Sequence, residues 1–175
     1  MSRHYVVEKT FKHEGLECAI LFCSMGHRCG YVAVEKDSPL FGIDYSDDLK
    51  RPELLKELKQ TNIGKRGIIP VLCWDGKSVS PEILFNVHGG LTYSGKGCYP
   101  VTRPKELWWF GFDCAHVDDA KDLQGIMNNF PEKQWKNSYI FSPEYTNYGT
   151  VKTLPYVEQE CKNLAEQIRC IESVY

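Results

Sequence analysis

The run from Leu107 to His116 constrains the fold more than any other part of this 175-residue chain. Side chains alternate between the two faces of an extended strand. One face of this run is therefore wholly apolar, and we assign it to the core. It consists of Trp108, Phe110, Phe112 and Cys114.

The other face of the same run mixes Trp109, Gly111 and Asp113. A glycine within a strand often marks a place where a ligand or another backbone comes close. A carboxylate is unexpected in so aromatic a run, and a polar tail from His116 to Asp119 follows it. We therefore expect functional groups on this face.

A second stretch, residues 87–95, shows a similar alternation. Its apolar face is predicted to carry Val87, Leu91 and Tyr93, and its polar face His88, Gly90, Thr92 and Ser94. If the two stretches pair as antiparallel neighbours, which their short spacing favours, His88, Thr92, Ser94 and Asp113 share one polar floor. We take that floor as the expected centre of function.

Composition narrows the class of protein. Hydrophobic residues make up 42% of the chain and the formal net charge is −2, as in a folded globular domain with no bias towards nucleic acid. The eight cysteines include no C-x-x-C pair, and most lie in apolar runs, which indicates free thiols. With no leader-like start and no apolar run long enough to span a membrane, the sequence favours a reducing cytoplasm.

Three strands are expected first. Residues 5–11 and 16–22 read as a hairpin that turns at His13–Gly15, and residues 31–35 read as a third strand. Residues 47–81 read as an elaboration of the sheet rather than a second domain, with a short helix at 52–58, a strand at 68–74 and a hairpin turn at Asp75-Gly76. Residues 117–149 read as loop.

The last helix opens at Thr153-Leu154-Pro155. Its predicted buried face recurs at helical spacing and consists of Val157, Cys161, Leu164, Ala165, Ile168 and Ile171. We therefore predict a single α+β domain over residues 1–175: a mainly antiparallel sheet of about six strands with the C-terminal helix packed on one face.

Three segments resemble a family of small proteins from tailed bacteriophages. They are residues 24–32, containing HRCGYV, residues 87–95, VHGGLTYSG, and residues 108–116, WWFGFDCAH; the ending from Gly149 looks like the same family's ending. The resemblance covers most of the chain apart from residues 47–81. It implies a phage-encoded accessory protein working in the host cytoplasm, and such proteins often counter bacterial defence, some by sequestering nucleotide signals.

The first functional hypothesis is binding of a small nucleotide-like ligand without chemistry, and without a cofactor or a bound metal. Glycine turns expose backbone N–H groups that bind anions, and an arginine can grip a phosphate. Aromatic rings offer stacking surfaces, while imidazole, hydroxyl and carboxylate groups fix orientation. The expected ligand-binding residues are His27, Arg28, Tyr31, His88, Gly89, Gly90, Thr92, Tyr93, Trp109, Asp113 and His116.

The main alternative is a phosphodiester or nucleotide hydrolase that uses His88, Asp113 and His116. The same three residues, with His27, are acceptable zinc ligands, but their spacing matches no metal motif. Cys29 beside Arg28 is a further candidate, as a reactive thiolate. A third hypothesis is an inhibitor of a host protein that binds through residues 47–81; a homo-oligomer also stays open.

Overall fold

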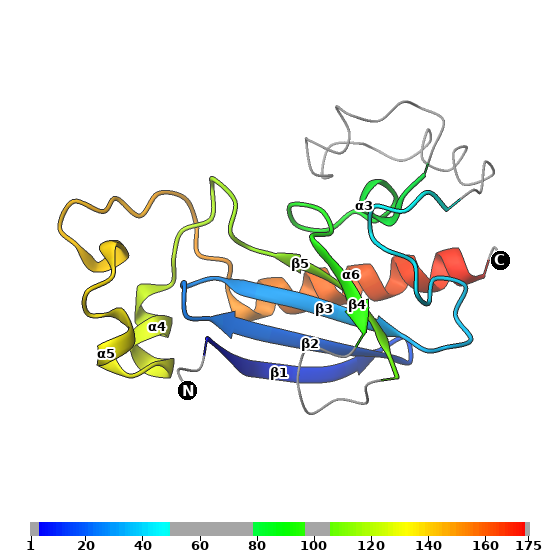
Figure 1. Ribbon diagram of the computed structural model, residues 1–175, viewed down its shortest axis with the longest axis horizontal. Coiled ribbons are helices and arrows are strands. Elements are labelled where there is room, and N and C mark those ends of the chain that lie inside the picture. Colours follow the sequence, from blue (N-terminus) through cyan, green and yellow to red (C-terminus); the bar gives the residue numbers. More distant parts are fainter. Residues whose placement is uncertain (1–3, 50–78, 97–105, 174–175) are drawn as a thin grey trace.

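Five antiparallel strands form the sheet on which the described chain is built (Figure 1). The computed structural model describes residues 4–49, 79–96 and 106–173. The strands are β1 (Tyr5–His13), β2 (Leu16–Cys23), β3 (Arg28–Val34), β4 (Tyr93–Lys96) and β5 (Trp108–Asp113), in the spatial order β1-β2-β3-β5-β4. The sixth strand expected at 68–74 lies outside the described residues, as does the helix expected at 52–58.

The helix α6 (Leu154–Glu172) packs along one face of the sheet, mainly against β3 and β2 (Figure 1). Its buried residues are the six predicted from helical spacing. They join Phe110, Phe112 and Cys114 of the β5 segment in the main core, which confirms both the α+β class and the core face of β5.

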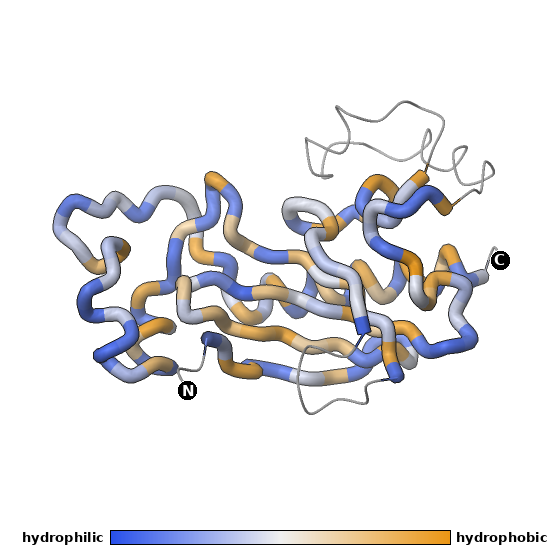
Figure 2. The backbone as a smooth tube through the Cα atoms, viewed as in Figure 1, coloured by the Kyte–Doolittle hydropathy of each residue, from blue (hydrophilic) through white to orange (hydrophobic). Residues whose placement is uncertain are grey.

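The opposite face of the sheet carries a second apolar cluster. Tyr31, Trp109 and Leu21 belong to it, and Trp109 is fully buried. Because both faces are covered, β2 is buried along nearly its whole length, and Figure 2 shows it as an almost continuous hydrophobic run.

Both early hairpins are built by residues at positive φ. Glu14 and Gly15, at φ 50° and 74°, form the two-residue turn between β1 and β2, as predicted. Gly26, at φ 80°, closes the three-residue loop between β2 and β3, where the Cys23 N–H donates to the His27 carbonyl at 2.9 Å. The loop thus sets the register of β3.

The segment between β5 and α6 holds more regular structure than the loop expected there. It contains α4 (Leu123–Asn129), α5 (Glu132–Trp135) and the 3₁₀ turn η2 (Tyr139–Phe141), which form one end of the molecule (Figure 1). Helix α3 (Pro81–Leu84) precedes β4. These helices are too short for their apolar spacing to stand out in the sequence.

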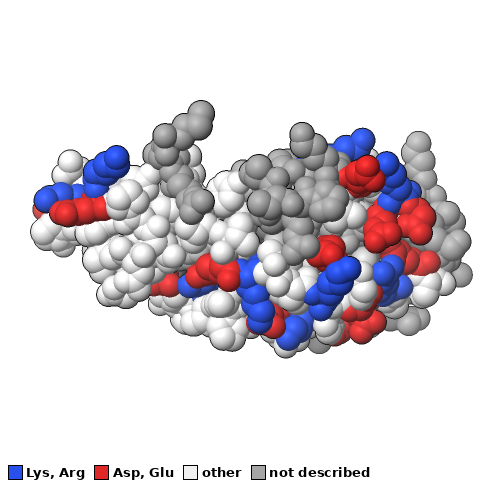
Figure 3. Space-filling model, turned by 90° about the horizontal axis from the view of Figure 1, so that it is seen from below, with Lys and Arg blue, Asp and Glu red and all other residues white. Residues whose placement is uncertain are grey.

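Acidic and basic side chains alternate on the face seen from below (Figure 3). Over the described residues of that face, no broad basic patch is visible. This agrees with the absence of a Lys/Arg block in the sequence.

Candidate functional site

Two segments that are distant in sequence meet beside the first turn of α6. His88 comes from the turn before β4, and His116 and Asp119 come from the loop after β5. Asp119 Oδ2 lies 2.8 Å from His88 Nε2 and 3.2 Å from His116 Nδ1. One carboxylate therefore joins two imidazoles, and we name this group the His–Asp–His site.

Asp119 is buried, with 2% of its side chain exposed, whereas 39% of the His116 side chain is exposed. The backbone N–H of His116 also donates to Asp119 Oδ2, at 2.9 Å, and Lys152 Nζ lies 3.4 Å from Oδ1. Burial raises the pKa of Asp119, but the hydrogen bonds from His88 and His116 outweigh it, so the net pKa is lowered. Asp119 is thus ionised at neutral pH.

An ionised carboxylate can only accept hydrogen bonds, and this fixes both imidazole tautomers. Neutral His88 carries its proton on Nε2 and neutral His116 carries its proton on Nδ1, since those nitrogens face Asp119. His116 Nε2 then keeps its lone pair, and no hydrogen-bond partner for it is found among the described residues. The site therefore presents one basic nitrogen on a half-exposed ring.

Tyr156 extends the network on the other side. Its hydroxyl lies 2.9 Å from His88 Nδ1, and burial, followed by Glu160, raises the pKa of Tyr156 to about 12. A neutral phenol donates to His88 Nδ1, which agrees with the tautomer set by Asp119. The Glu160 carboxylate accepts from the His88 backbone N–H at 2.8 Å, which anchors the turn on α6.

Two glycines at positive φ make these approaches feasible. A Cβ at Gly89 would lie 1.9 Å from His116 Cε1, and a Cβ at Gly149 would lie 2.2 Å from the Asp118 carbonyl oxygen. The Thr150 N–H donates to that same carbonyl at 3.0 Å. Gly89 thus seats the His116 ring, while Gly149 lets the loop before α6 pair with the segment that carries Asp119.

His88, His116 and Asp119 could also hold a metal ion, because their ligand atoms lie within 4.8 Å of one another. Asp119 Oδ2, however, already accepts from three N–H groups, and Lys152 already supplies a positive charge beside the carboxylate. Hydrogen bonding therefore accounts for this arrangement without a metal.

Arg28 does not take the phosphate-binding place expected for it. Its guanidinium forms a bidentate pair with Glu8, at 2.7 and 2.9 Å, and also donates to Asp122 and to the Lys152 carbonyl. Four of its five N–H groups are thus used. Glu8 reaches Arg28 because it occupies a β-bulge between Val7 and Lys9, and a bulge re-aims its side chain.

The expected stacking surface does not form at Trp109, which is fully buried. Gly111 is approached by Tyr31 rather than by a ligand, since a Cβ there would lie 2.5 Å from Tyr31 Cδ1. Tyr31 and Tyr93 contact each other edge to face, with centroids 5.6 Å apart. Tyr93 therefore packs on the face opposite α6, whereas Val87 and Leu91 lie in the main core.

The single polar floor expected from His88 to Asp113 divides into separate networks. Asp113 accepts from Thr92 Oγ1 at 2.9 Å, and Ser94 donates to Asp44. Residues 86–90 form a turn, with Gly89 and Gly90 at φ 68° and 87°, so counting in twos fails there. His27 lies apart, beside Cys23 and Cys29.

Asp119, Lys152 and Tyr156 complete the His–Asp–His site, although the sequence did not single them out. The spacing of His116 and Asp119 was an available signal, because an acidic side chain can accept from the backbone N–H three residues before it, as in a capping box. For Lys152 and Tyr156 no local signal exists, since their contacts with residues 119 and 88 are long-range.

The site and the fold define an α+β protein with a carboxylate-linked histidine pair. No protein-family model matches the chain, and no similar curated protein or solved structure was found. Of the helices in residues 4–49, 79–96 and 106–173, none has the length and apolar character needed to cross a bilayer.

Proposed function

We propose that the protein is a hydrolase of phosphodiesters or nucleotides, with His116 as its general base. The observation that carries this proposal is the bond from the buried carboxylate of Asp119 to His116 Nδ1. An imidazole oriented in this way can take a proton on its other nitrogen while the carboxylate stabilises the resulting cation.

In this mechanism His116 Nε2 removes a proton from the water that attacks phosphorus. As the new P–O bond forms, the P–O bond to the leaving group breaks, and the protonated imidazole returns the proton to the departing oxygen. Asp119 keeps His116 in the required tautomer and orientation, and His88 fixes Asp119 from the other side with Tyr156 behind it. Lys152 pairs with Asp119 and offsets its negative charge, so the carboxylate repels an anionic substrate such as a phosphate ester less strongly. His116 is the proposed catalytic residue; Asp119, His88 and Tyr156 are positioning residues.

Sequestration of a nucleotide-like signal by a phage protein is the second candidate, and it rests on analogy with other small phage proteins. Two of its expected contacts lose support. Arg28 is paired with Glu8 and Asp122, and Trp109 is fully buried. His116 Nε2 remains available to contact a ligand. We therefore rank hydrolysis ahead of sequestration.

The two candidates are separated by incubating the protein with cyclic and linear signal nucleotides and with a chromogenic phosphodiester. We expect the wild-type protein to form products. The rate of product formation should fall at least about 100-fold in His116→Ala, because the general base is lost. His13→Ala is the matched control, because His13 pairs with Glu166 elsewhere on the molecule. Nucleotides that bind but are recovered intact after denaturation would favour sequestration, and equal turnover by His116→Ala would contradict the proposal.

A further inference from the structure

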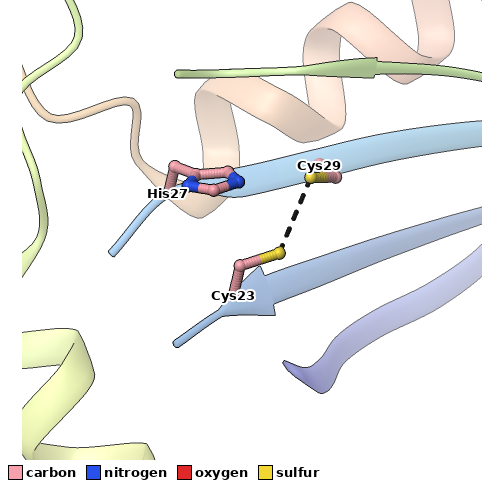
Figure 4. A group of neighbouring side chains, drawn as sticks. All are labelled: Cys23, His27 and Cys29. Carbon is pink, nitrogen blue, oxygen red and sulfur yellow. Dashed lines mark hydrogen bonds between the residues drawn. The ribbon is translucent and has the colours of Figure 1, made fainter. Parts of the chain in front are cut away.

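A second cluster of potential ligands lies on the hairpin between β2 and β3, outside the His–Asp–His site. Cys23, His27 and Cys29 place their ligand atoms within 4.8 Å of one another (Figure 4). Strand alternation puts His27 and Cys29 on one face of the sheet, and the three-residue loop brings Cys23 opposite His27. The hairpin therefore builds the cluster directly.

The spacing of the two sulfur atoms suits a tetrahedral metal. Cys23 Sγ and Cys29 Sγ are 3.7 Å apart. Two thiolates at a zinc–sulfur distance of about 2.3 Å, separated by a tetrahedral angle, lie roughly 3.8 Å apart. The pair is too distant for a disulfide, whose sulfur atoms are about 2.05 Å apart.

His27 supports the same interpretation. Figure 4 shows one of its ring nitrogens directed towards the two sulfur atoms. Its Nδ1 atom is buried and has no hydrogen-bond partner within the described part of the chain. The nitrogen that faces the sulfur atoms is the one farther from the backbone, and it is the ligand atom that His27 offers to the cluster.

We propose that Cys23, His27 and Cys29 bind one Zn²⁺ ion, with solvent in the fourth position. Two sulfur ligands and one imidazole form a donor set that selects zinc over magnesium or calcium. No other His, Cys, Asp or Glu among the described residues joins the group within 4.8 Å, so a fourth site stays open to solvent. The proposal is independent of hydrolysis at His116.

The test uses full-length reduced protein titrated with Zn²⁺, with stoichiometry read by native mass spectrometry and affinity by competition with a chromophoric chelator. We expect one equivalent per chain. Cys23→Ser and His27→Ala should each weaken zinc binding by more than about 100-fold. Loss of a residue that only hydrogen-bonds to a metal ligand already lowers metal affinity by about 10–100-fold. Cys170→Ser, an exposed cysteine on α6, and His116→Ala should bind as wild type does.

Cobalt substitution in the wild-type protein provides a readout that does not depend on folding of the variants. Bound Co²⁺ should show a thiolate charge-transfer band and the visible bands of tetrahedral coordination. Failure of the wild type to bind zinc, absence of the thiolate band, or unchanged affinity in Cys23→Ser would each overturn the proposal. So would loss of the bound ion in His116→Ala, which would move the metal to the His–Asp–His site.

Discussion

Gly89 lies directly against the imidazole of His116, so that a Cβ at position 89 would fall 1.9 Å from His116 Cε1. The two residues are connected by contact rather than by a hydrogen bond. The position of the proposed general base therefore depends on a residue that has no side chain.

Replacing Gly89 by alanine should displace the His116 ring and reduce turnover, in addition to a backbone cost of about 1–3 kcal/mol from its φ of 68°. The measurements are the His116 ring resonances in NMR spectra, turnover, and the free energy of unfolding in urea.

Gly42 offers a matched control for this change. Its φ is 83°, but a Cβ there would meet nothing within 4 Å. Gly42→Ala should lose a comparable amount of stability and leave the His116 resonances unchanged. An undisturbed His116 ring in Gly89→Ala would show that the contact does not position it.

Asp119 should make the free energy of unfolding depend on pH in the acidic range. Its pKa is lowered in the folded protein, so its stabilising contribution is present above the unfolded carboxyl pKa and is lost as pH falls through the folded value. Asp119→Asn removes this contribution and leaves Lys152 without its partner. We expect a loss of about 3–5 kcal/mol at pH 7, as when a buried pair is broken.

Urea unfolding of wild type and Asp119→Asn at pH 7 and at pH 3 measures this effect. The difference between the two proteins should shrink at the lower pH, because the unfolded wild-type chain then takes up a proton at Asp119 that the folded protein, with its lowered pKa, takes up less readily. Asp118→Asn, an exposed neighbour, is the control and should unfold as wild type does. A difference that stays constant with pH would contradict the ionised state of Asp119.

Arg28 should contribute to the stability of the folded protein through its ion pairs. Arg28→Ala leaves the carboxylates of Glu8 and Asp122 without their cation in a poorly exposed place, at a cost of about 3–5 kcal/mol. Lys136→Ala, which breaks an exposed pair with Glu132, should cost about 1 kcal/mol or less. Thermal unfolding compares the two.

Ligand binding by folded Arg28→Ala protein tests the sequence-based role of this residue. Affinity for phosphate-containing ligands should remain at the wild-type level if the guanidinium serves the fold. A selective loss of phosphate affinity at low temperature, where the variant is still folded, would restore the phosphate-binding hypothesis.

Periodic segments were predictable from the sequence because each carries its own pattern. The buried face of α6, from Val157 to Ile171, and the core face of β5 both follow from residue spacing. The turn at Glu14 and Gly15 was predictable as well, since the flanking strands fix it.

The sequence placed His88 and His116 with Asp113, whereas in the structure both imidazoles bond to Asp119 and Asp113 bonds to Thr92. Asp113 lies in β5 and Asp119 lies in a loop, and only the fold of that loop around Gly149 brings Asp119 to the histidines. The cluster at Cys23 was missed for a related reason: a search for adjacent cysteines overlooks two that face each other across a hairpin.

Arg28 and Cys29 are consecutive residues of β3, yet they point to opposite faces of the sheet. The Arg28 guanidinium bonds to Asp122, just before α4, and to the Lys152 carbonyl, before α6. The Cys29 thiol lies beside Cys23 on the other face. A slip of β3 by one residue against β2 and β5 would exchange their sides, placing a thiol among carboxylates and a guanidinium among aromatic rings. The register of this one strand therefore controls the chemistry on both surfaces at once.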